Sequence, residues 1–215
     1  MVAWGEVARC NTSGAARMDE ALMWWRRMTR HASVRDEVKT RGTGLVAFGA
    51  FSFADDSASG GALIVPRYVL GRVAGRSFFT VVGDASTPPV SLAAALAEAT
   101  PVSPLPPVTV DAGDEPRWSA AVAAAVARIG AGEVSKVVLA RAVEARADGP
   151  IDVRAILANL AADYDMCWTF HVDGMIGATP ELLARVDHGL VTSRVLAGTI
   201  RMTGDDMGDL ARAAK

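Results

Sequence analysis

The chain has 215 residues, of which 51% are hydrophobic, and this is enough for a buried core. Its 22 basic and 24 acidic residues nearly balance and give a net charge of −2 at pH 7. A nucleic-acid-binding protein needs an excess of positive charge to contact phosphates, so we expect no nucleic acid partner. The composition favours a globular protein that acts on a small molecule.

The N-terminal segment carries no sign of export. Glu6 and Arg9 interrupt its apolar residues, so it lacks the continuous apolar stretch of a secretory signal. No later stretch approaches the ~20 apolar residues of a membrane span. Cys10 and Cys167 lie far apart, without a Cys or His at metal-ligand spacing, so neither a disulfide framework nor a zinc site is predicted. We expect a soluble, cytoplasmic protein with no membrane partner.

The first part of the chain predicts one helix followed by strands. The helix covers Ala15–His31, with acidic residues early and basic residues late, as the helix dipole favours. Alternating apolar residues predict a strand over Gly44–Phe53. Two more β-rich runs follow at Ala62–Val65 and Ser77–Val82, so we expect an antiparallel meander.

A linker then divides the chain. An alanine-rich helical stretch begins after Pro88, and prolines crowd residues 101–107 at a density that prevents regular structure. We therefore expect residues 1–107 and residues 108–215 to form two different parts of the protein.

The second part opens with a helix that delivers the chain to a lysine. Pro116 favours the helix start, and an apolar stripe runs to Gly130. The stripe consists of Trp118, Val122, Val126 and Ile129. The run Lys136–Arg141 is rich in β-branched residues and predicts a strand, with Lys136 on the same face as Val138 and Ala140.

A helix and two hairpins complete the predicted elements. Asp152 is the expected N-cap of the helix, and Met166–Val172 is the first strand after it. Asp173–Gly174 should form a hairpin turn, and the return strand reaches Pro180. Because proline cannot donate to a strand ladder, we expect an irregular backbone just before Glu181.

The last predicted hairpin turns at His188–Gly189. The strand Leu190–Leu196 follows it and ends in Ala197, Gly198 and Thr199. A glycine at a strand end lets backbone N–H groups approach an anion, and a threonine adds a hydroxyl.

Three motifs in chain order resemble successive signatures of the chorismate-binding enzymes. They are Lys136-Val-Val-Leu-Ala-Arg, Gly177-Ala-Thr-Pro-Glu-Leu-Leu and Leu196-Ala-Gly-Thr. The resemblance is closest to the isochorismate synthases of menaquinone or siderophore synthesis. It implies an α+β fold with antiparallel sheets and helices packed on the outside. Residues 108–215 would then be the first, incomplete part of the chorismate-binding catalytic region.

In the family that these motifs resemble, the residue at the position of Lys136 distinguishes members that insert ammonia from members that insert water. Members that insert ammonia have glutamine at its position, whereas members that insert water have lysine. The resemblance thus implies that Lys136 is the base that activates water for attack at C2 of chorismate. Glu181 would be the acid that protonates the departing C4 hydroxyl. No glutaminase subunit is then expected.

These two roles make opposite demands on protonation. A free lysine has a pKa near ~10.4, so a base at Lys136 needs desolvation, which Val138 and Ala140 would supply. Glu181 must keep its proton near neutral pH, which flanking Pro180, Leu182 and Leu183 would favour.

The resemblance further implies that Ala197, Gly198 and Thr199 bind the substrate. It also implies Mg²⁺ for the complete enzyme, with glutamate ligands that we expect beyond Lys215. We expect Asp205, Asp206 and Asp209 to lie in a solvated loop and not to be Mg²⁺ ligands. Two alternatives remain: a salicylate synthase, which shares the lysine, and a truncated, inactive fragment of the same family.

Overall fold

The structure, a computed structural model, describes residues 1–194. Its contacts divide the chain into two compact units. The first consists of Met1–Thr100 with the segment that starts at Asn159, and the second is Pro101–Ala158. Both combine helices with antiparallel strand pairs, so the α+β class is confirmed. The division expected between residues 107 and 108 stays a prediction.

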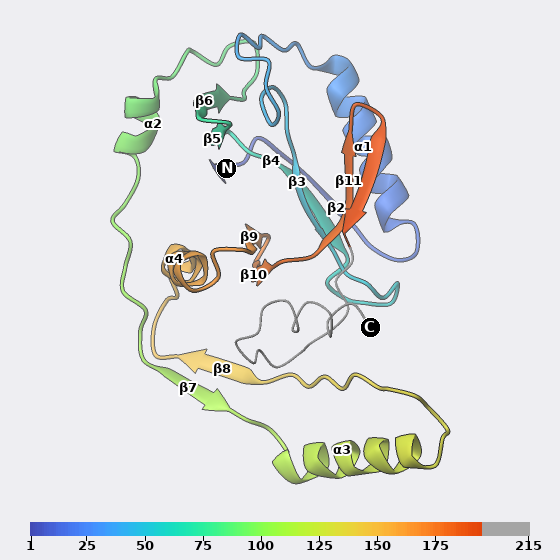
Figure 1. The fold of residues 1–215 in the computed structure, drawn as a ribbon. Helices are drawn as coiled ribbons and strands as arrows, with labels where there is room; N and C mark the ends of the chain where they lie inside the picture. The colour runs from blue at the N-terminus through green and yellow to red at the C-terminus, as the bar shows by residue number, and fades with distance from the viewer. Residues whose placement is uncertain (195–215) are drawn as a thin grey trace. The chain divides into compact units, whose positions relative to one another are not determined.

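Two three-stranded antiparallel sheets form the centre of the first unit (Figure 1). One has the order β2-β4-β3 and the other the order β1-β5-β6. The strands are β1 (Val2–Trp4), β2 (Ala8–Thr12), β3 (Phe48–Phe51), β4 (Gly61–Val65), β5 (Tyr68–Val73) and β6 (Arg76–Val81). The predicted strands β3, β4 and β6 are confirmed, but the simple meander is wrong. The short strands β1 and β2 pair with β5 and β4, and such distant pairing leaves no local pattern in the sequence.

The predicted first helix is confirmed as α1 (Arg17–His31), which packs on β2 and β4. Ala21 is the buried apolar residue of this helix, and Val65 and Val69 are the largest fully buried side chains of the described residues. Trp4, Tyr68 and Phe79 form an aromatic cluster on the other sheet, with ring centroids 5.3 to 6.2 Å apart. The core of the first unit therefore lies along its two sheets.

The remaining elements of the first unit lie where local sequence patterns predicted them. The alanine-rich stretch forms α2 (Leu92–Ala97), capped by the Ser91 side chain. Two hairpins follow later in the chain, with turns at Asp173–Gly174 and His188–Gly189 as predicted. Their strands are β9 (Trp168–Val172), β10 (Met175–Thr179), β11 (Leu182–Asp187) and β12 (Leu190–Arg194). All four turn residues have positive φ, which explains the Asp-Gly and His-Gly pairs.

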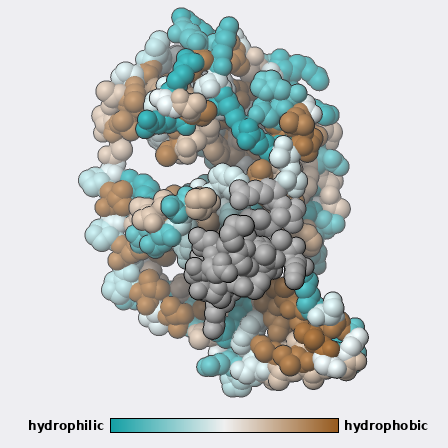
Figure 2. All heavy atoms as spheres, viewed as in Figure 1, coloured by the Kyte–Doolittle hydropathy of each residue, from teal (hydrophilic) through white to brown (hydrophobic). Residues whose placement is uncertain are grey.

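The second unit contains a strand pair and a long helix. Strand β7 (Val108–Asp111) pairs with β8 (Glu144–Ala147), and α3 (Glu115–Gly130) lies between them in sequence. Helix α4 (Val153–Asp163) begins here behind Asp152, whose carboxylate accepts the Arg154 N–H at 3.0 Å. None of residues 101–158 is buried. Figure 2 accordingly shows apolar side chains on the surface around α3, where Val122, Val126 and Ile129 are exposed.

Across residues 1–194, no helix is both long enough and apolar enough to cross a membrane.

Candidate active site

Helix α3 positions Lys136. Asp114 caps the helix by accepting the Arg117 N–H at 2.9 Å, and Pro116 follows in the first turn. The helix ends before Gly132, whose φ of +77° suits glycine. An ion pair of 2.8 Å between Arg128 and Glu133 spans this end, and Lys136 follows Glu133 after Val134 and Ser135. The predicted helix before Lys136 is therefore confirmed.

The strand predicted at Lys136–Arg141 is wrong. This segment has no ladder partner among the described residues, and the strand of this region is β8, further along the chain. Backbone N–H and C=O groups need paired partners to form a sheet, whatever the β propensity of the side chains. Arg141 holds the end of the segment near α3, with its guanidinium carbon 5.5 Å from the centre of the Trp118 ring.

A hairpin and a proline position Glu181. Strand β10 ends at Thr179, and Pro180 stops the ladder because it lacks an N–H. The Glu181 N–H donates to the Thr179 hydroxyl oxygen at 3.1 Å. Strand β11 begins next and shifts register between Leu182 and Arg185. The irregular backbone predicted before the carboxylate is confirmed, and it presents Glu181 in a short non-strand segment.

The structure does not bring the predicted base and acid together within one compact unit. Lys136 belongs to the second unit and Glu181 to the first. Both side chains are exposed. Val138, which should shield the lysine, is 91% exposed, and Leu183 beside the glutamate is 89% exposed. Neither Val138 nor Leu183 therefore shields its neighbour in the way predicted, because both apolar side chains are exposed.

The predicted substrate-binding residues Ala197, Gly198 and Thr199 lie outside the described residues. So do Asp205, Asp206 and Asp209. Their roles stay predictions.

The described residues do not fit a magnesium site. Within residues 1–194 no group of three or more His, Cys, Asp or Glu side chains could hold a metal ion. Mg²⁺ takes several oxygen ligands in an octahedral arrangement, usually with carboxylates among them. No catalytic step is therefore assigned to a metal held by these residues.

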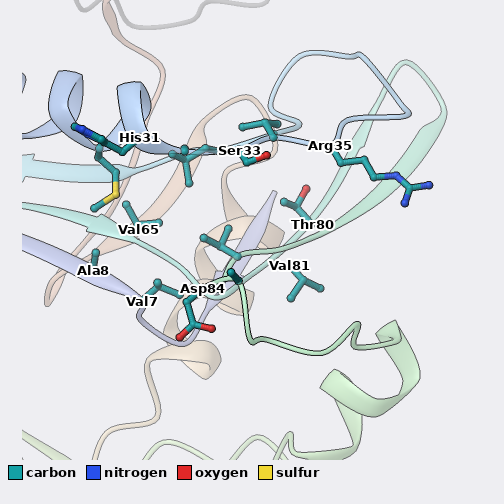
Figure 3. Close-up of a pocket in the computed structure, with 17 residues that line it drawn as sticks. Val7, Ala8, His31, Ser33, Arg35, Val65, Thr80, Val81 and Asp84 are labelled. Carbon is teal, nitrogen blue, oxygen red and sulfur yellow. The ribbon is translucent and has the colours of Figure 1, made fainter.

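The first unit contains a cavity that Glu181 does not line (Figure 3). It has a volume of about 480 Å³ and is lined by the end of α1, the loop after it, and the ends of β4 and β6. Buried Val65 lines it together with Val81, while the Arg35 side chain extends outward and pairs with Glu37 at 2.9 Å. All the residues that line this cavity belong to the first unit.

Two arginines that the sequence did not single out connect distant segments of this unit. Arg9 on β2 pairs with Asp173 in the β9–β10 turn at 2.7 Å. Arg17 is 5% exposed and binds backbone carbonyls and Asp55. No local signal reveals the contacts with Asp173, Ser52, Phe53 and Asp55, because these partners lie far from the arginines in sequence.

Comparison with known proteins identifies the chain's relatives. The family model described as "Chorismate binding enzyme" matches residues 1–215. The isochorismate synthase MenF of Bacillus subtilis (strain 168) is 29% identical over 221 residues, covering 91% of this chain and 47% of that protein. The isochorismate synthase EntC of Escherichia coli (strain K12) is 39% identical over 93 residues, or 41% of this chain and 24% of that protein.

A further relative is the putative isochorismate synthase MenF of Mycobacterium tuberculosis (strain H37Rv). It is 34% identical over 94 residues, covering 39% of this chain and 25% of that protein. No solved structure matches the chain. The chain spans about half the length of the Bacillus subtilis relative. Because the family model matches the chain from end to end, this protein belongs to the family of chorismate-binding enzymes.

Proposed function

We propose that the chain is the first part of an isochorismate synthase, which converts chorismate to isochorismate. The observation that carries the proposal is Lys136 in the motif Lys-Val-Val-Leu-Ala-Arg, at the position where ammonia-using members have glutamine. The names of the relatives support it, because one isochorismate synthase matches 91% of the chain and another matches 41%. The pathway would be menaquinone or siderophore synthesis, in the cytoplasm.

In this proposal Lys136 removes a proton from water as its oxygen bonds to C2 of chorismate. The ring double bonds shift, the bond from C4 to its hydroxyl breaks, and Glu181 protonates the leaving oxygen. One water is consumed and one released, so the reaction is an isomerisation. General acid and base catalysis each contribute roughly 10²- to 10⁴-fold in rate. No ammonia is needed, and hence no glutaminase subunit.

The proposal requires the two side chains to be less exposed in the working enzyme than they are in residues 1–194. Burial among apolar groups favours the neutral, basic form of a lysine side chain. We infer that the remaining length of the family's proteins supplies the covering apolar groups and the Mg²⁺ ligands. The support for this is that the chain covers 47% of the Bacillus subtilis relative.

An assay of defined fusions tests the proposal. The chain is fused to the residues of the Bacillus subtilis relative that follow the matched region and is supplied with chorismate and Mg²⁺. Isochorismate is measured with a coupled isochorismatase, and chromatography detects salicylate or an amino product. We expect isochorismate from the fusion, and at least a ~100-fold lower rate after Lys136→Ala or Glu181→Gln.

The control is Lys39→Gln, at an exposed lysine in the loop between α1 and β3. It should retain the unsubstituted rate. Unchanged turnover after Lys136→Ala would remove the lysine from the role of base. Salicylate as the product would replace the proposed reaction by that of a salicylate synthase.

A further inference from the structure

An ion pair joins the N-terminal region to the hairpin that leads to Glu181. Nη1 of Arg9, on β2, donates to Oδ1 of Asp173 at 2.7 Å. Asp173 lies in the turn between β9 and β10, 164 residues along the chain. This contact ties the hairpin to the β2-β4-β3 sheet.

Arg9 is held on both sides. Its Nε donates to Oε2 of Glu6 at 3.0 Å, while its Nη1 donates to Asp173. The Arg9 side chain is 30% exposed and that of Asp173 39% exposed. The guanidinium group is planar and keeps its charge. An arginine that is bonded to two carboxylates is therefore more ordered than one in an isolated surface ion pair.

The β9–β10 hairpin needs an anchor of this kind. A two-stranded hairpin is only marginally stable by itself. Within the described residues neither β9 nor β10 pairs with a third strand. Strand β9 also contacts β3, so the hairpin meets the sheet there and through Arg9.

The hairpin also carries Glu181 at its other end. The ladder runs from Met175 opposite Val172 at the turn to Thr179 opposite Trp168 at the open end. Thr179 then accepts the Glu181 N–H. If the turn were released, the hairpin could pivot at β3 and move the glutamate. A misplacement of about 1 Å at a reacting group can cost roughly 100-fold in rate.

We infer that Arg9 is a positioning residue: through Asp173 it fixes the β9–β10 hairpin and thereby the place of Glu181. The catalytic consequence rests on the proposed function, whereas the anchoring does not depend on it. Two independent measurements therefore test the inference.

The first measurement is amide hydrogen exchange on the full 215-residue chain. Arg9→Ala removes the cation, and Asp173→Asn removes the charge while tolerating the φ of +51° at this turn. Each should lower protection of the β9, β10 and Glu181 amides by about threefold to fivefold. The double variant should lose no more than either single one, because both remove the same contact. Arg72→Ala, at an exposed arginine of β5, is the matched control and should change nothing.

The second measurement is kinetic and uses the fusion described above. Arg9→Ala should lower kcat about fivefold, with KM changed less than twofold, since Glu181 acts in the chemical step. Arg9→Lys, which keeps the charge, should restore part of the loss. A role in folding alone would lower the amount of active enzyme without changing kcat per active site.

The outcomes separate the two ideas. If the fusion makes no isochorismate, the proposed function fails, and protection at the Glu181 amide still decides whether Arg9 places that residue. Unchanged protection in Arg9→Ala overturns the inference even if the fusion is active. Equal effects of Arg72→Ala and Arg9→Ala would overturn it as well.

Discussion

Arg17 shows how one buried charge organises the start of α1. Its guanidinium donates to the carbonyl oxygens of Gly14 at 2.8 Å, Ser52 at 3.0 Å and Phe53 at 2.8 Å, and it also pairs with Asp55. These carbonyls belong to the chain before the helix and to the segment after β3. Arg17 therefore gives the carbonyls of Ser52 and Phe53 a donor, and it joins two segments distant in sequence.

Replacing this arginine should cost stability. Arg17→Met keeps the length of the side chain but leaves the carbonyls of Ser52 and Phe53 without their donor. Breaking such a buried, hydrogen-bonded charge costs about 3 kcal/mol. Urea unfolding followed by tryptophan fluorescence should show this loss, whereas Arg27→Met, at an exposed arginine of the same helix, should change stability by less than ~0.5 kcal/mol. Equal midpoints for the two variants would contradict the structural role of Arg17.

At this scale the sequence predicted roles for single residues but not their tertiary contacts, and the roles of Lys136 and Glu181 stay predictions. Lys136 and Glu181 were found from motifs, which are local strings of residues. Arg9 and Arg17 were not, because their importance comes from partners that folding brings together. An arginine on a strand or in a first helical turn is ordinary in sequence, and only the tertiary contact distinguishes it.

Among the elements, turns and caps were predicted well because their signals are local. Asp173–Gly174 and His188–Gly189 adopt the positive φ values that hairpin turns require. Strands were predicted less well. The run Lys136–Arg141 has the composition of a strand but no partner within residues 1–194, whereas Glu144–Ala147 pairs with β7 despite its charged residues. Pairing depends on a second segment, which composition cannot reveal.

The start of α4 gives a pH-dependent prediction. The side-chain hydrogen bond from Arg154, and after it the Ser103 N–H, hold the pKa of Asp152 well below its ordinary value. A carboxyl with a lowered folded-state pKa stabilises the fold above its unfolded value of ~3.9, and it loses this contribution as pH falls through the lower folded value. The capping contacts should therefore be intact from pH 7 to about 4 and weaken only in stronger acid.

Carboxyl chemical shifts followed by NMR measure this directly. Asp152 should titrate below the ordinary aspartate range in the unsubstituted chain. In Arg154→Ala its pKa should rise toward ~3.9, because the first cause of the shift is gone. Asp148, an exposed aspartate before the same helix, is the control. The explanation would be wrong if Asp152 titrated identically in both chains.

For the whole molecule, the sequence motifs predict the family, whereas only the structure shows how well each unit is packed. The family model matches every residue of the chain, and three motifs predicted that membership from sequence. The same motifs contain no information on how well each region is packed. The first unit buries Val65, Val69 and Phe78, while the second contains no buried residue. The two units should therefore differ strongly in local stability.

Hydrogen exchange on the unsubstituted chain should reveal that difference. Amides in the centre of β4 and β5 open only with the unfolding of the first unit, since their side chains are buried between paired strands. Amides of β7 and β8 belong to a two-stranded ladder without buried side chains, and such ladders open locally. We expect protection at least ~100-fold lower in β7 and β8. Comparable protection in both pairs would contradict the structure, because a ladder cannot resist opening without apolar burial on at least one face.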